Sequence, residues 1–81
     1  MEEALKTVED FLAEYQANND WNPVEIRVLP SGDEQDHIKI WFNFGDGVTD
    51  VEPLKQVVID AMKAAHPELG EFQLEVRADA F

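Results

Sequence analysis

The chain has 81 residues, 44% of them hydrophobic, and its 18 Asp and Glu against 6 Lys and Arg give a formal net charge of −12. This length corresponds to a single domain, residues 1–81, and the apolar fraction is too high for an acidic disordered segment. The absence of cysteine excludes disulfides, thiolate metal ligands and Cys nucleophiles. A negative field of this strength excludes direct binding to nucleic acid or to anionic membranes and favours a basic protein as partner.

The first predicted element is an amphipathic helix from Glu2 to about Asn18. Apolar residues recur in it at helical spacing, and neither Gly nor Pro interrupts them. These apolar positions are Leu5, Val8, Phe11, Leu12 and Tyr15. The Asn- and Asp-containing segment 18–23 follows, and its composition predicts a turn that ends the helix.

Two segments of alternating apolar and polar residues predict a β-hairpin. The polar loop 31–36 separates them, and alternation with a period of two is typical of half-buried strands. The inward-facing positions would be Val24, Ile26 and Val28 in the first strand and Ile38, Ile40, Phe42 and Phe44 in the second.

A second helix is predicted after the turn at Gly45-Asp46-Gly47. The segment Thr49-Asp50-Val51-Glu52 has the pattern of a capping box, and Pro53 is tolerated in a first helical turn. The buried face of this helix would comprise Val51, Leu54, Val57, Val58, Ala61, Met62 and Ala65. His66-Pro67 ends the helix, because the residue before a proline avoids the helical region. A third strand follows, with Phe72, Leu74, Val76 and Ala78 facing inward.

This order of elements predicts an α+β fold, a two-layer αββαβ sandwich with a three-stranded mixed sheet and both helices on one face. The third strand would run parallel to the second, and the strand order 1-2-3 is favoured because the second strand is the most apolar. The order resembles that of prokaryotic KH domains, which are built αββααβ, in fold alone. RNA binding is not implied, because the chain lacks their GxxG loop and has carboxylates where phosphates would need cations.

Acidic residues are predicted to form a ridge that binds the partner. At 100° per residue, five acids fall on the side of the first helix opposite its apolar stripe, with Lys6 alone among them. Acids of the hairpin loop are expected near the start of this helix and further acids near its end. The ridge would span about 25 Å, or about seven base pairs of duplex. Its members are Glu2, Glu3, Glu9, Asp10, Glu14, Asp20, Asp33, Glu34, Asp36, Asp46, Asp50 and Glu52.

Small acidic phage and plasmid proteins that mimic DNA are similar to this chain in size, charge and lack of cysteine. This compositional resemblance implies a non-enzymatic inhibitor that imitates a phosphate backbone and blocks a basic nucleic-acid-handling protein, in phage or mobile-element counter-defence. An immunity or antitoxin protein that neutralises a basic nuclease toxin would present almost the same surface. A solvated helix face, or the surface hydration of a protein from a halophilic source, would also explain the acidity.

A homodimeric structural or ligand-binding module is the third hypothesis. It would use the open face of the sheet, where Leu29 and Trp41 are expected among charged residues. Trp41 would be exposed there, unless arginine stems stack on the ring or a β-bulge turns it inward.

No catalytic, cofactor-binding or metal site is expected. The G-x-G-x-x-D pattern at 45–50 is a degraded dinucleotide fingerprint that a turn and a helix cap explain. His37 and His66 have no nucleophile nearby in the sequence. The first residues lack the features of a signal peptide and no stretch has the apolar length of a membrane span, which favours a cytoplasmic location.

Overall fold

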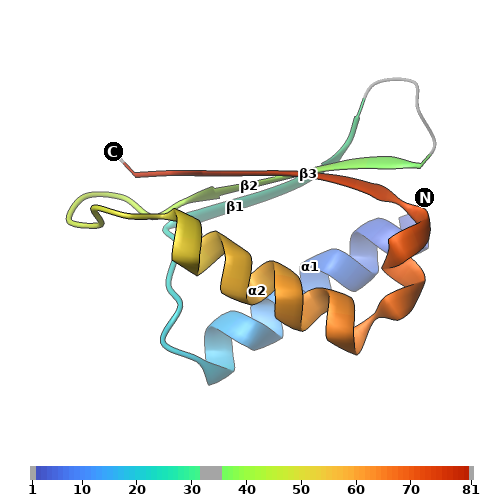
Figure 1. Cartoon of the computed structure of the whole chain (residues 1–81), viewed down its shortest axis with the longest axis horizontal. Helices are drawn as coiled ribbons and strands as arrows, with labels where there is room; N and C mark the ends of the chain where they lie inside the picture. The colour runs from blue at the N-terminus through green and yellow to red at the C-terminus, as the bar shows by residue number, and fades with distance from the viewer. Residues whose placement is uncertain (1, 32–35, 81) are drawn as a thin grey trace.

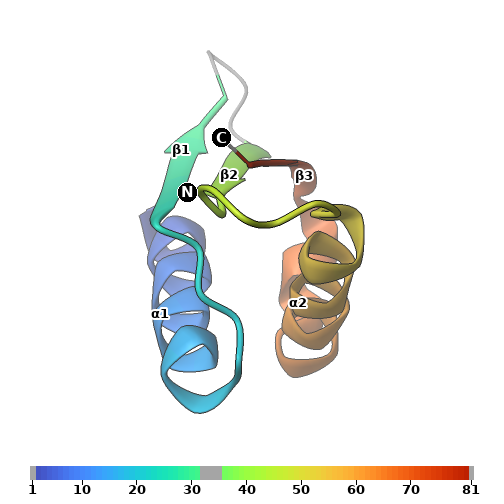
Figure 2. The same ribbon diagram turned by 90° about the vertical axis from the view of Figure 1, so that its left-hand side faces the viewer.

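The computed structural model describes residues 2–31 and 36–80. A three-stranded sheet forms one layer, and two helices cover one of its faces as the other layer (Figures 1 and 2). The predicted α+β class and two-layer arrangement are therefore confirmed. In chain order the elements are α1 (Glu2–Asn18), β1 (Glu25–Pro30), β2 (His37–Asn43), α2 (Glu52–Ala65), the 3-10 helix η1 (Pro67–Glu71) and β3 (Gln73–Asp79).

The sheet has the strand order β1-β2-β3, as predicted. β1 pairs antiparallel with β2, so that Arg27 lies opposite Trp41, and β2 pairs parallel with β3, so that Trp41 lies opposite Arg77. β2 occupies the centre, and its inward-facing residues are the most completely buried of the three strands. Ile38, Ile40 and Phe42 are all at most 1% exposed. The outward-facing residues of the three strands consequently lie in rows across the free face of the sheet.

The hydrophobic core fills the space between the inner sheet face and the two helices. Val8 and Leu12 contribute from α1, and Val58 and Met62 from α2, all with essentially no exposed surface. Burying one such aliphatic side chain contributes about 1.5–3 kcal/mol, so these contacts hold the helices against the sheet.

Trp21 belongs to the core, although the sequence places it in a turn. Only 2% of its surface is exposed. Its ring meets Phe42, Tyr15 and Phe44 edge-on, with centroids 5.0, 5.5 and 5.8 Å away. Its indole N–H donates a hydrogen bond of 3.0 Å to the backbone carbonyl of Leu54. The linker between α1 and β1 therefore ties α1, the sheet and the start of α2 together.

The buried face of α2 differs from the predicted face. Val57, which was expected inside, is 49% exposed, whereas Ile59, which was not, is only 6% exposed. The apolar stripe is centred between Val58 and Met62, and at 100° per residue Val57 lies roughly 120° from that centre while Ile59 lies roughly 80° from it. Ala65, also expected inside, is exposed.

The predicted capping box at the start of α2 does not form. The helix begins at Glu52, its N-cap is Val51, and no side chain caps it. With the helix starting this late, Thr49 is not at the N-cap position that a capping box requires. The Asp50 carboxylate instead accepts a hydrogen bond of 3.2 Å from the Glu52 N–H. At the other end, α2 stops before Pro67 as predicted, and η1 follows and buries Leu69.

Candidate protein-interaction surfaces

All five acids predicted on the outer side of α1 are exposed, opposite the buried Val8 and Leu12. Asp10 forms an ion pair of 3.7 Å with Lys6, and both side chains are largely in solvent. Within the described part of the chain, Glu2, Glu3, Glu9 and Glu14 make no ion pair. We call these five carboxylates, Glu2, Glu3, Glu9, Asp10 and Glu14, the α1 acidic face.

The α1 acidic face covers a broad arc of the helix. Glu9 lines a hollow of about 290 Å³ with Ile26 and Val28, beneath β1. Glu14 lines another of about 270 Å³ with Tyr15 and His66, between the two helices. A partner that contacts all five carboxylates would therefore have to wrap around α1 and could not touch it along a single line.

The other predicted ridge residues lie at the two ends of the molecule. Asp33 and Glu34 are outside the described residues. The backbone carbonyl of Asp36 accepts a hydrogen bond from the N–H of Gln73 at the start of β3. β3 and α1 begin at the same end of the molecule (Figure 1). The linker 19–24 and the loop 45–51 lie together at the opposite end, the first rising from α1 and the second extending from the sheet (Figure 1). Asp20, Asp36, Asp46, Asp50 and Glu52 are all exposed.

The outer face of the sheet is electrically balanced. Arg27 pairs with Glu25, Lys39 with Glu75 at 3.8 Å, and Arg77 with Asp79 at 2.9 Å. Half of the six cations of the chain are thus matched with three acids on this face, and the net charge of −12 is carried by the rest of the molecule. The structure separates a neutral sheet face from an acidic helix face.

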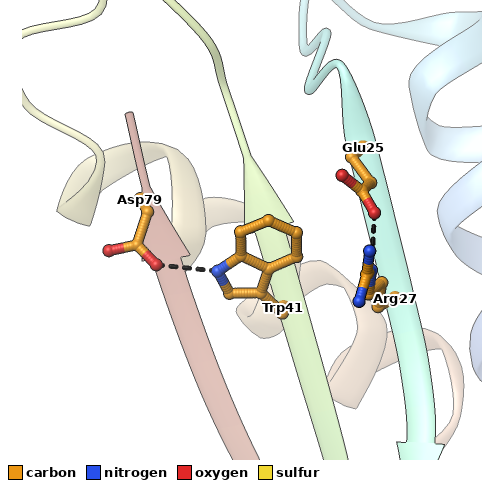
Figure 3. A network of polar contacts seen from close by, with 4 residues as sticks. All are labelled: Glu25, Arg27, Trp41 and Asp79. Carbon is orange, nitrogen blue, oxygen red and sulfur yellow. Dashed lines mark hydrogen bonds and ion pairs between the residues drawn. The ribbon is translucent and has the colours of Figure 1, made fainter. Parts of the chain in front are cut away.

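Trp41 lies on the outer sheet face, as expected, and is partly covered there (Figure 3). Its indole N–H donates a hydrogen bond of 2.7 Å to Oδ2 of Asp79. The Arg27 guanidinium lies 5.5 Å from the ring centroid, within the range of a cation–π contact. An arginine therefore lies over the ring, through its guanidinium group and not through its stem as expected, and the ring does not turn inward. Leu29 remains 54% exposed on the same face.

The sequence did not indicate a role for Asp79. Its position two residues after Arg77 nevertheless places it on the outer face of the sheet. Its Oδ2 accepts hydrogen bonds from the Trp41 indole and, at 2.9 Å, from Nε of Arg77. The Trp41 hydrogen bond, helped by the hydrogen bond and positive charge of Arg77, holds the pKa of Asp79 below its ordinary value of 3.8, against the opposing effect of desolvation.

Replacing Trp41 with Phe is expected to raise the pKa of Asp79, because it removes the larger of the two hydrogen bonds. A carboxyl whose pKa is lowered in the folded state stabilises that state fully above its unfolded pKa, and the stabilisation is lost as the pH falls through the folded pKa. The wild-type protein should therefore lose more stability than the variant between neutral pH and the acid limit. A carboxyl NMR titration of Asp79, with urea unfolding across the same pH range, would measure both effects. An unchanged Asp79 pKa in the variant would contradict this assignment.

Two shallow hollows flank Trp41 on the outer face. One, of about 460 Å³, is lined by residues of β2 and β3 that include Lys39, Glu75 and Arg77, and the other, of about 350 Å³, by Arg27, Leu29 and Lys39. Neither hollow contains a hydroxyl or thiol nucleophile. These hollows offer contact area, and nothing in their lining indicates a reaction.

Other types of site receive no support from the described residues. Among residues 2–31 and 36–80, no group of three or more His, Asp or Glu is placed to hold a metal ion. Gly45 and Gly47 have φ of 73° and 91°, so the turn alone accounts for the glycines of the G-x-G pattern. None of the helices described has the length and apolar character needed to cross a membrane.

Comparisons with protein-family models, with curated proteins and with solved structures find no match for this chain. The acidic helix face and the neutral sheet face are therefore the features that bear on function.

Proposed function

We propose that the protein is a non-enzymatic binding protein whose α1 acidic face occupies the phosphate-binding surface of a basic, nucleic-acid-handling protein. The main support for this proposal is the separation of charge between the acidic face of α1 and the neutral outer face of the sheet. Within residues 2–31 and 36–80, four of the five carboxylates on α1 have no ion-pair partner, while the sheet face matches each of its cations with an acid.

Unpaired carboxylates on a helix suit this role for two reasons. Binding to a basic surface would not require breaking existing ion pairs, so the Coulomb attraction is not offset by their loss. The helix is also held to the core by Val8 and Leu12, which keeps the charges in place before the partner arrives. With 17 residues, α1 extends about 25 Å at 1.5 Å per residue.

The arrangement has a cost that a merely solvated helix would not need to bear. Like charges four residues apart destabilise a helix by about 0.2–0.5 kcal/mol per pair, and Asp10 and Glu14 are such a pair. Glu2 and Glu3, in the first turn, are favoured by the helix dipole and offset part of this repulsion. A basic nuclease toxin is one member of the partner class, so an immunity protein remains within the same proposal.

Binding to such a partner is expected to weaken steeply with salt. Proteins captured from a cell lysate by the immobilised chain should be basic, and their affinity should fall at least about tenfold between about 0.05 M and about 0.5 M salt, as the Debye length shortens from above 10 Å to a few ångströms. Added duplex DNA should displace them, because it would compete for the same surface. A captured partner whose affinity changes with neither salt nor duplex DNA would refute the proposal.

A further inference from the structure

β3 is an edge strand, and two hydrogen bonds at its ends show which of its backbone groups face outward. The Gln73 N–H donates to Asp36 at 2.7 Å, and the Asp79 carbonyl accepts from Phe44 at 2.9 Å, so the odd-numbered residues point toward β2. The N–H and C=O of one strand residue point to the same side, and this side alternates along the strand. Leu74, Val76 and Ala78 therefore point their backbone donors and acceptors away from the sheet.

No further strand pairs with this edge in the described chain. The sheet ends at β3, and among residues 2–31 and 36–80 no backbone hydrogen bond outside the regular elements involves Leu74, Val76 or Ala78. β3 also contains no proline, a residue that commonly blunts an edge strand, whereas β1, at the other edge, ends in Pro30.

The sequence of β3 is complementary to itself. If a second copy pairs antiparallel with β3 about Val76, Glu75 of each copy lies opposite Arg77 of the other. Leu74 then lies opposite Ala78, and Val76 opposite Val76, so apolar residues meet on the inner face and opposite charges on the outer face. Opposite charges and apolar pairs directly across a ladder are both stabilising.

We propose that two copies of this chain associate through β3, antiparallel about Val76, to form a continuous six-stranded sheet. In this register the residues whose backbone groups point away from β2 form the hydrogen-bonded pairs. Val76 exchanges both backbone hydrogen bonds with Val76 of the second copy, and Leu74 exchanges both with Ala78 of the second copy. Glu75 and Arg77 then occupy the non-hydrogen-bonded positions, where opposed side chains are closest. Backbone pairing and charge pairing thus select the same register.

Neighbouring registers are less favourable. The helix-facing side chains of both copies must lie on the same side of the six-stranded sheet. Because directly opposed residues share one face of a sheet, the two-fold axis has to pass through a residue of β3 and cannot pass between two residues. Pairing about Glu75 would bring two glutamates face to face, and pairing about Arg77 would do so with two arginines. Pairing about Leu74 or Ala78 would shorten the ladder.

The position of β3 also limits repulsion between two acidic chains. α2 lies beneath the β3 side of the sheet and α1 beneath the β1 side (Figure 2). α2 carries Lys55 and Lys63, so the side that would meet the second copy is less acidic than the α1 side. The α1 acidic faces would point away from each other and remain free for a partner.

The charge pair provides the test. Arg77→Glu and Glu75→Arg should each weaken self-association at least about tenfold in sedimentation equilibrium, because each change turns two symmetry-related attractions into repulsions. An equimolar mixture of the two variants should form a mixed dimer, and the double variant should recover the wild-type affinity. Both single variants stay strongly acidic, so a general attraction between them cannot account for mixed dimers. Trp41→Ala serves as the control on the outer sheet face and should not alter association.

Amide hydrogen exchange gives a second readout. With rising protein concentration, exchange should slow at Leu74, Val76 and Ala78, while Gln73, already bonded to Asp36, should change little. A chain that stays monomeric at millimolar concentration would overturn the proposal, as would a dimer that the single variants leave intact. Added salt should strengthen self-association by screening the repulsion between acidic chains, whereas it weakens binding to a basic partner. The two proposals can therefore fail independently.

Discussion

Replacing Trp21 with alanine is expected to lower the free energy of unfolding by about 3–5 kcal/mol, the range found when a large aromatic side chain is removed from a core. The ring meets three other aromatic rings, and its N–H is bonded to Leu54 at the start of α2. A domain of this size has a total stability of only about 4–12 kcal/mol. The variant should therefore lose at least about a quarter of the stability of the domain, as measured by urea unfolding followed by circular dichroism.

Two further variants separate the contributions to this effect. Trp21→Phe keeps an aromatic ring but removes the indole N–H and some volume, and we expect a smaller loss of about 1–3 kcal/mol. Val57→Ala removes a half-exposed side chain from α2 and should cost less than about 1 kcal/mol. A Trp21→Ala protein that unfolds at nearly the wild-type urea concentration would show that the linker does not hold the two layers together.

The regular elements of this fold could be predicted because their patterns are local. Apolar residues recur without interruption along α1 and alternate along the three strands, and these patterns also determine which side of each of these elements faces inward. Val24 is an exception: it was expected to face inward, but β1 begins only at Glu25 and Val24 is 71% exposed. The strand order followed from the apolar character of β2. The same helical geometry correctly placed all five carboxylates of α1 in solvent.

Features that depend on distant residues could not be predicted. Trp21 stands in a segment with the composition of a turn, and its burial depends on contacts with Phe42 and Leu54, far away in the chain. The hydrogen bond between Trp41 and Asp79 joins residues 38 positions apart and requires the register of β2 and β3. Similarly, the free backbone groups of β3 become apparent only once the strand order and the hydrogen bonds at both ends of the strand are known.

Val57 and Ile59 show that the buried face of a helix is harder to predict than its position in the sequence. Both are β-branched apolar residues in the middle of α2, and either can be assigned to a stripe about 100° or more wide. The stripe that forms is centred on Val58 and Met62, which places Ile59 inside and Val57 outside. Sequence periodicity located the helix correctly but not its rotation about its own axis.

Replacing Asp10 and Glu14 together with Lys is expected to abolish binding to the basic partner while leaving the fold intact. The double change substitutes two positive charges for two negative ones on successive turns of the α1 acidic face. Both side chains are exposed, so the buried Val8 and Leu12 are not disturbed. Charge reversal within a contact replaces attraction by repulsion and should weaken binding by at least about a hundredfold.

Three comparisons make this experiment specific to α1. The neutral variant Asp10→Asn with Glu14→Gln should have an intermediate affinity, since it removes the attraction without adding repulsion. Asp60→Lys with Glu68→Lys changes the net charge by the same amount on exposed residues of α2 and η1, outside the predicted ridge. If net charge alone governed binding, this control would lose the partner as completely as the α1 variant.

Trp41→Ala distinguishes the acidic surface from the neutral one. It removes the ring at the centre of the outer sheet face, together with its contacts to Asp79 and Arg27, and leaves every carboxylate of α1 in place. The variant should keep the basic partner, with the fold of each protein checked by circular dichroism. Retained binding in the α1 double variant, together with loss of the partner in Trp41→Ala, would place the binding site on the sheet face and reject the phosphate-mimic proposal.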